Sequence, residues 1–277
     1  MMKYVLGADI GSGSVKLTLL SREGMIAATA GCEYPTHYPH VGWCEQDPED
    51  WCVAFKTAFA QILKDAGISA EQIEALSFDA ATHTAVLLDE NKQVLRRAIL
   101  WTDQRSKAEV QELKDTCLDI IMDQVVNAPT TVWTLPQMMW LRKHEPEVWG
   151  KIRYLLFAKD YLRFRMTGSI ETDTIDAAGS MFYDAKRECW SKELCAVGGI
   201  QEAWLPKLCN PTDQVGTVTG ERAKEFGLAE GTKVLCGTPD TVMEVFAAGN
   251  VEPGHSTVKL ATAGRICVVT DKPLDSK

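Results

Sequence analysis

The sequence lacks the long apolar runs of a membrane protein. No apolar stretch approaches the roughly 18 residues that a spanning helix needs. The first residues do not form a basic segment followed by an apolar one, as a secretory leader would. These absences predict a cytoplasmic protein without a membrane partner.

Cysteine is present, but without the spacing of a metal site or a disulfide framework. The nine cysteines are odd in number and scattered, and no pair has C-x-x-C spacing. Most lie inside apolar patterns. We therefore expect small buried thiols of a reducing compartment rather than zinc ligands or disulfides.

An excess of positive charge is absent as well. The net charge of −9 argues against a nucleic-acid partner, although it leaves room for a local basic pocket that binds a phosphorylated ligand. The apolar content of 45% and the charged content of 24% are typical of globular proteins. The length of 277 residues predicts about two domains.

The most informative segment that is present lies at the N-terminus. An apolar run from Tyr4 ends on Asp9, a turn of glycine and serine follows, and a second apolar run continues to Leu20. This pattern predicts a β-hairpin with a polar turn. The turn from Gly11 to Ser14 can bind an anion through its N–H groups. No P-loop or dinucleotide fingerprint is present, and such a turn taken alone is more often structural.

The rest of the chain alternates between short apolar runs and capped, helically spaced segments. We expect three strands within residues 3–31, further strands over 73–78, 98–101 and 233–236, a hairpin over 86–95, and helices over 47–67, 104–115, 219–226 and 239–248. Thr238 is the expected N-cap of the last helix. This alternation is typical of an α/β domain.

The C-terminal segment repeats the design of the N-terminal hairpin. Residues 257–269 again read as an apolar strand, a turn of small residues and an apolar strand. The repeat predicts a duplicated protein of two lobes. Because two strands cannot bury a sheet face, the segment either belongs to a longer protein or packs on the first domain or a partner.

Six segments in order resemble the FGGY family of carbohydrate kinases, and within it the xylulokinases. They are residues 7–16, 43–48, 99–105, 158–168, 173–179 and 237–240. The resemblance implies an actin-like ATPase (ribonuclease-H-like) fold, in which a mixed sheet is flanked by helices. It also implies a sugar-binding lobe over 1–248 and, over 249–277, the first hairpin of a truncated nucleotide-binding lobe.

The resemblance further implies the substrates and the reaction. The sugar binds in the first lobe, ATP mostly in the second, and Mg²⁺ accompanies the nucleotide. A hydroxyl of a ketose such as D-xylulose, or of a related sugar or polyol, attacks the γ-phosphate in line. Asp240 is implied as the general base, and Asp9 as the residue that holds Mg²⁺ or its water.

The remaining site residues also follow from the resemblance. The phosphate-binding residues would be Gly11, Ser12, Gly13, Ser14, Lys16, Thr262 and Gly264. The sugar-binding residues would be Thr82, His83, Trp101, Asp103, Asp240 and Thr241. For Trp101 and Asp103 a second interpretation stays open, in which a buried Trp and an Asp103–Arg105 pair stabilise the fold. Lys159, Asp160 and Asp176 are interpreted as structural.

Three segments differ from the family pattern. His83 lies in Ala-Thr-His-Thr instead of Gln-Met-His-Gly, and Thr241 follows Asp240 where xylulokinases usually have Asn. The second turn reads Ala-Thr-Ala-Gly over 261–264 instead of Gly-Thr-Ser-Gly. The sugar therefore need not be D-xylulose, and phosphate binding at the second turn is expected to be weaker.

The sequence leaves two other classes of function as alternatives. A catalytically inactive sugar-binding or partner-binding module is the alternative if no nucleotide lobe exists. An actin-like ATPase without a sugar substrate fits less well, because it leaves His83 and Asp240 without a role. Exposed second-lobe surface would also favour a homodimer.

Overall fold

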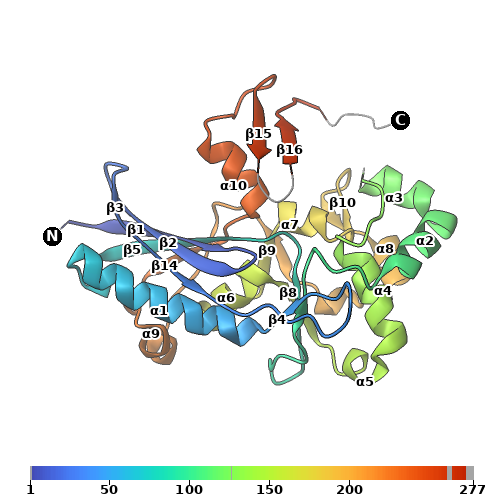
Figure 1. Cartoon of the computed structure of the whole chain (residues 1–277), viewed down its shortest axis with the longest axis horizontal. Coiled ribbons are helices and arrows are strands. Elements are labelled where there is room, and N and C mark those ends of the chain that lie inside the picture. The colour runs from blue at the N-terminus through green and yellow to red at the C-terminus, as the bar shows by residue number, and fades with distance from the viewer. Residues whose placement is uncertain (1, 126, 261–263, 273–277) are drawn as a thin grey trace.

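A six-stranded mixed sheet forms the centre of the computed structural model, which describes residues 2–125, 127–260 and 264–272 (Figure 1). The strand order is β13-β14-β5-β1-β2-β3, in which β1, β5 and β14 are parallel. The strands are β1 (Tyr4–Ile10), β2 (Ser14–Ser21), β3 (Ile26–Glu33), β5 (Ile73–Ala80), β13 (Gln214–Thr217) and β14 (Lys233–Leu235). The three predicted N-terminal strands are thus confirmed, and so is the predicted mixed sheet flanked by helices.

Helix α1 (Pro48–Ala66) lies between the capping residues that the sequence predicts. The Asp47 carboxylate accepts the N–H of Glu49 at 3.0 Å, and Gly67 ends the helix in the left-handed conformation. The apolar stripe of α1 packs on β2 and β3. With α6 (Ala158–Thr167) and α9 (Gly220–Phe226) it covers one face of the sheet, below the sheet in Figure 1, and closes the larger core.

A second core lies beside the sheet, at the right of Figure 1. There β6 (Ala85–Leu88) pairs with β8 (Tyr154–Phe157), and side chains of both strands share an apolar cluster with the helices α2 (Lys107–Thr116), α3 (Leu118–Gln124), α4 (Thr134–His144) and α8 (Lys192–Gly198). The predicted hairpin over 86–95 is confirmed, because Leu88 bridges Val94 and the N–H groups of Asp89 and Leu95 donate to the carbonyls of Gln93 and Leu87 at 3.0 and 2.9 Å. The additional pairing of β6 with β8, which comes from far along the chain, was not predicted.

Short elements connect these two parts. They are β4 (Glu45–Gln46), β7 (Ala98–Ile99), α5 (Pro146–Trp149), β9 (Glu171–Asp173), α7 (Thr174–Gly179), β10 (Tyr183–Asp184), β11 (Cys189–Trp190) and β12 (Lys207–Cys209). Two short 3₁₀ turns, 70–72 and 202–204, complete the described elements. No helix within the described ranges is both long and apolar enough to cross a membrane.

The C-terminal elements lie on the other side of the sheet, above it in Figure 1. Helix α10 (Asp240–Ala247) is followed by β15 (Ser256–Leu260) and β16 (Gly264–Val268), which form a separate two-stranded sheet. The two strands of the predicted repeat are thus confirmed. Thr262, a predicted phosphate-binding residue of the turn between them, lies outside the described residues.

Candidate active site

A cavity of about 620 Å³ lies where β1, β2, β5 and α10 meet. Five predicted site residues line it, namely Asp9, Gly11, Ser12, Lys16 and Asp240. The fold therefore brings the N-terminal turn, the candidate metal-binding acid and the candidate base to one cavity, although some 230 residues separate Asp9 from Asp240 in the chain. Asp79, Glu244 and Lys259 line the same cavity and were not predicted.

Gly237 explains how Asp240 reaches this cavity. Its φ is +77°, and a Cβ atom built on it would lie 1.9 Å from the carbonyl oxygen of Phe78 in β5. The next residue, Thr238, donates its N–H to that carbonyl at 3.2 Å. The chain thus crosses β5 at a distance that only glycine permits, and this crossing sets Asp240 beside the end of the strand.

The start of α10 differs from the prediction. The helix begins at Asp240 with Pro239 as N-cap, so the predicted Thr238 cap is wrong. The buried Thr238 hydroxyl instead donates to Oδ1 of Asp173 at 3.1 Å. Pro239, with φ of −59° and ψ of 148°, is still extended, so the helix starts one residue too late for Thr238 to cap it.

Asp240 has the surroundings of a proton acceptor. Its Oδ1 accepts the N–H of Thr241 at 2.6 Å and the Thr241 hydroxyl at 3.2 Å. Burial raises the pKa of Asp240 above its usual value, and the two Thr241 hydrogen bonds oppose this only in part. A carboxylate with a raised pKa accepts a proton more readily at neutral pH.

Asp79 is a further candidate residue of the site, and it was not predicted from the sequence. In the parallel pairing of β1 and β5, Asp79 lies directly beside Asp9. Burial, followed by the negative charge of Asp9, raises the pKa of Asp79 to about 8. In the sequence, each of these two acids ends an apolar run, which is the one feature that could have indicated Asp79 as a site residue. The two acids become neighbours only because β1 and β5, which are far apart in the sequence, pair in this register.

The N-terminal turn is held by side chains from three other segments. The ring N–H of Trp101 donates to the Ser12 hydroxyl at 3.3 Å, and the Gln46 amide donates to the Ser12 carbonyl at 2.8 Å. The Tyr34 hydroxyl binds the Gly11 carbonyl. A Cβ atom on Gly13 would meet no other atom within 4 Å, so the turn is open there. Trp101 thus supports the turn that carries Ser12.

The residues of the cavity fit Mg²⁺ in its usual protein setting. The part of the chain that the structure describes contains no group of three or more metal-ligating side chains. Mg²⁺ commonly keeps several waters and takes only one or two carboxylates in addition to substrate phosphates. Asp9 and Asp79 supply such carboxylates, and Lys16 contacts Asp9 at 3.3 Å.

His83 lies in a tight pocket just beyond β5. Its ring packs against that of Trp133 at 4.9 Å between centroids, and a Cβ atom on Gly179 would lie 2.4 Å from its Nδ1. Neither ring nitrogen has a hydrogen-bond partner within the described ranges, and burial lowers the pKa of His83 to about 3. His83 is therefore a neutral imidazole, and neither it nor Thr82 lines the cavity of Asp240.

The contacts of Asp103 are those of a residue that stabilises the fold. Its two carboxylate oxygens accept the side chain of Arg105 at 2.8 and 2.9 Å and the N–H of Cys44 at 2.6 Å. The carboxylate is buried, and the Arg105 guanidinium lies over the ring of Trp43. Of the two interpretations offered for Asp103, the geometry favours stabilisation of the fold over sugar binding.

A buried ion cluster connects the surroundings of His83 and Asp240. The Lys159 ammonium contacts the carboxylates of Asp160 at 2.7 Å, Asp173 at 2.7 Å and Asp176 at 3.1 Å. Asp176 also accepts the N–H of His83 at 2.9 Å. Because Asp173 in turn accepts the Thr238 hydroxyl, one ammonium group supports both segments of the candidate site.

The C-terminal hairpin contributes an arginine that was not predicted as a site residue. Arg265, next to the predicted Gly264 on β16, donates to the Thr241 hydroxyl and to Oε2 of Glu244, both at 2.8 Å. Lys259 on β15 binds the other oxygen of Glu244. Thr241 therefore lies between Asp240 and the hairpin, and Gly264 itself does not line the cavity.

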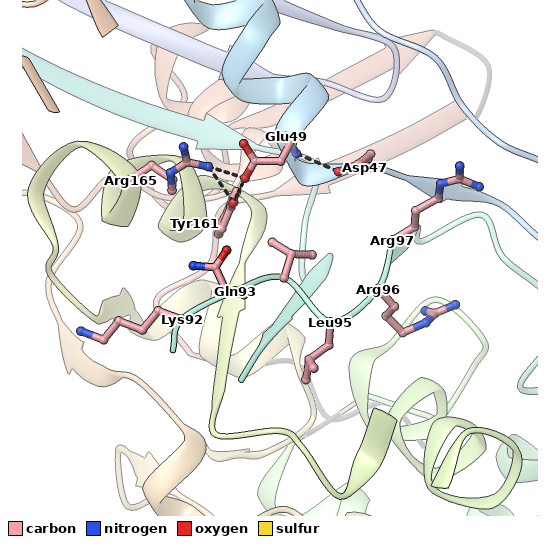
Figure 2. A pocket seen from close by; sticks show the side chains of 10 residues that line it. Asp47, Glu49, Lys92, Gln93, Leu95, Arg96, Arg97, Tyr161 and Arg165 are labelled. Atoms are coloured by element: carbon pink, nitrogen blue, oxygen red, sulfur yellow. Dashed lines mark hydrogen bonds and ion pairs between the residues drawn. The ribbon is translucent and has the colours of Figure 1, made fainter. Parts of the chain in front are cut away.

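A separate cavity of about 540 Å³ lies near the start of α1 and is drawn in Figure 2. Arg165 and Tyr161 both bind Glu49 there, and these side chains point toward one another. The cationic groups of Lys92 and Arg97 point away from one another (Figure 2). No predicted site residue lines this cavity, so it is not the candidate active site.

Comparison with known proteins gives matches over nearly the whole chain. The model of the FGGY family of carbohydrate kinases, N-terminal domain, matches residues 4–247. A xylulose kinase of Bacillus subtilis is 36% identical over 265 residues, which cover 96% of this chain and 53% of that protein. The chain spans about half the length of the curated relatives it matches.

Solved structures give the same result. The xylulose kinase of Rhodospirillum rubrum superimposes with a TM-score of 0.94 at 27% identity, over 99% of this chain and 56% of that one. The gluconate kinase of Lactobacillus acidophilus superimposes with a TM-score of 0.93 at 25% identity, over 99% of this chain and 55% of that one. Proteins named for different sugar substrates thus share this fold.

Proposed function

The chain belongs to the FGGY family of carbohydrate kinases, and we propose that the protein transfers the γ-phosphate of ATP to a hydroxyl group of a sugar or polyol. The observation that carries this proposal is the cavity shared by Asp240, Asp9 and the Gly11–Ser12 turn. These are the parts that phosphoryl transfer needs, namely a base, a metal ligand and a phosphate-binding turn.

Asp240 is proposed as the general base. Thr241 holds Oδ1 through two hydrogen bonds, while Oδ2 accepts none from the described residues and is left for the substrate. The raised pKa favours uptake of the proton that the attacking hydroxyl releases. Such proton transfer typically contributes about 10²–10⁴-fold to the rate.

Asp9, Asp79 and the N-terminal turn are proposed to handle the phosphates. Mg²⁺, when bound, neutralises charge on the transferred group. Asp9 and Asp79 would hold it through carboxylate oxygens or through its waters. Lys16 and the open N–H groups around Gly13 would bind the phosphoryl oxygens, where fixed donors stabilise the developing charge.

The sugar pocket is proposed to include Thr82, His83, Trp101 and Thr241. The neutral His83 imidazole can donate from one nitrogen and accept at the other. Its unpartnered nitrogens support a role in binding, because buried polar atoms normally have a partner. The relatives are named as xylulose and gluconate kinases, so the class of sugar is proposed and the individual sugar is left open.

The domain boundary is proposed to lie near residue 248. Four apolar side chains on one face of the hairpin are exposed, namely those of Val258, Leu260, Ile266 and Val268. Matched relatives are about twice as long. We assign residues 249–277 to the start of a second, nucleotide-binding lobe, whose further strands would cover this face.

Calorimetry and turnover test the proposal together. The full-length protein should release ADP with one member of a panel of pentuloses, ketohexoses, aldonic acids and polyols. Asp240→Ala should lower kcat by about 10²-fold or more while sugar binding is retained. Asp213→Ala, outside the cavity, is the matched control.

Turnover that survives Asp240→Ala would exclude Asp240 as the general base. Sugar binding without any nucleotide binding would favour the catalytically inactive module.

A further inference from the structure

Two cysteines lie beneath the loop that carries Asp240. Cys209 is the last residue of β12, and Cys236 directly precedes Gly237. Their Sγ atoms are 3.1 Å apart. This separation is about 1 Å longer than a disulfide bond.

The backbone holds the two thiols together. The N–H of Cys236 donates to the carbonyl of Asp213 at 2.9 Å, and the N–H of Gly237 donates to the carbonyl of Pro211 at 2.9 Å. These bonds join the segment after Cys209 to the segment that contains Cys236. Two fixed stretches of chain therefore hold the two cysteines side by side.

The surroundings favour a thiolate at Cys209, whereas the hydrogen bond with Cys209 and burial raise the pKa of Cys236. The Arg163 guanidinium lies 3.3 Å from Sγ of Cys236 and donates to the Cys236 carbonyl at 2.6 Å. Hydrogen bonding by Cys236, assisted by the positive charge of Arg163, lowers the pKa of Cys209. Burial instead raises the pKa of Cys52 and of Cys195 to about 12. Cys209 is also partly exposed, whereas Cys236 is buried.

We propose that Cys209 and Cys236 form a redox modification site, in which mild oxidation by a peroxide joins them in a reversible disulfide. The proposal is independent of the kinase activity, because it rests on two thiols outside the candidate active-site cavity. A disulfide here ties β12 to the first residues of the loop that leads to Asp240.

The chemistry needs one molecule of hydrogen peroxide. The Cys209 thiolate attacks one peroxide oxygen, the O–O bond breaks, and the leaving hydroxide takes up a proton to become water. Cys236 then loses its proton and attacks the resulting sulfenic sulfur of Cys209, so that the S–S bond forms and a second water leaves. Two thiols are oxidised by two electrons, and the peroxide is reduced. A dithiol reductant reverses the step.

Peptide mapping of the folded chain tests this proposal. The chain is treated with a small excess of hydrogen peroxide, its free thiols are alkylated, and it is digested without reductant. We expect one linked pair of peptides, carrying Cys209 and Cys236, and a loss of two of the nine alkylatable thiols. Dithiothreitol should restore both. The link should form before the exposed Cys189 is oxidised.

Controls separate proximity in the fold from general reactivity. Cys209→Ser and Cys236→Ser should each abolish the link, whereas Cys189→Ser should leave it unchanged. In concentrated urea the preference for this pair should disappear. The proposal is overturned if no link forms while Cys189 is oxidised, if Cys209 stops at sulfinic acid with Cys236 free, or if another cysteine pair is joined first.

Discussion

At the scale of single residues, Gly237 decides whether Asp240 reaches the cavity. Gly237→Ala places a methyl group against the Phe78 carbonyl and forces a side chain into a positive φ. We expect a loss of about 2–4 kcal/mol in the free energy of unfolding, because backbone strain and overpacking add. Urea unfolding followed by tryptophan fluorescence measures it.

Gly231→Ala is the matched control for this substitution. Gly231 also has a positive φ, +85°, but a Cβ atom there meets no other atom within 4 Å. It should cost only about 1 kcal/mol, the penalty of the conformation alone. If both variants lose the same free energy of unfolding, the close contact with the Phe78 carbonyl is not the reason for glycine at position 237.

His83 makes the stability of the fold depend on pH. Burial lowers its pKa to about 3, whereas the unfolded chain has the usual value near 6.5. At His83 the unfolded state therefore binds more protons in this range, so the contribution of His83 to stability is complete above about pH 6.5 and falls as the pH is lowered. Asp79 acts in the opposite direction, because its pKa of about 8 makes the folded state bind the extra proton. Between pH 7 and pH 5 the loss from His83 should be about 2 kcal/mol.

Unfolding curves at several pH values test this dependence. His83→Asn, which suits the positive φ of 45° at this position, should gain about 2 kcal/mol relative to the unmodified chain between pH 7 and pH 5. The exposed His255→Asn variant should keep a constant difference from the unmodified chain. If the difference for His83→Asn also stays constant, His83 is not the group that titrates.

At the scale of elements, the ammonium of Lys159 joins α6, β9 and α7. Three buried carboxylates depend on it, and Arg163 is a further cation that contacts Asp160. Lys159→Met keeps most of the side-chain volume but leaves these carboxylates with too little positive charge. The expected loss is about 3–5 kcal/mol, as for other broken buried ion pairs.

The exposed pair of Lys186 and Asp123 supplies the control. Both side chains are 62% exposed, so Lys186→Met should change stability by no more than about 1 kcal/mol. Urea midpoints of the two variants at pH 7 give the comparison. A Lys159→Met variant as stable as the control would mean that the carboxylates compensate by taking up protons.

The element scale also shows what the sequence could predict and why. The limits of α1 were predictable because Asp47 and Gly67 act on their own neighbours. The pairing of β6 with β8, the neighbours Asp9 and Asp79, and the Thr238–Asp173 bond were not, because each joins residues far apart in the chain. Lys159 was interpreted as structural, but its link through Asp176 and Asp173 to His83 and Thr238 could be found only from the fold.

At the scale of the whole molecule, the cavity lies between a well-packed lobe and a loosely attached hairpin. The sheet, α1 and α6 share one apolar core, whereas β15 and β16 form a sheet of their own. The hairpin contacts α10 through the ion pairs of Glu244 with Lys259 and Arg265. All three side chains are about a third exposed, so these pairs contribute little to stability.

The proposed boundary near residue 248 therefore predicts how a shortened chain behaves. A chain that ends at Ala248 should unfold within about 1 kcal/mol of the full chain, because its main losses are partly exposed ion pairs and the hydrogen bonds of Arg265 to Thr241. It should also sediment as a monomer, whereas the full chain, with its exposed apolar hairpin face, should self-associate as its concentration rises. Urea unfolding and sedimentation velocity measure the two effects. A loss above about 2 kcal/mol would place the hairpin inside the first lobe, since surface pairs alone cannot account for a change of that size.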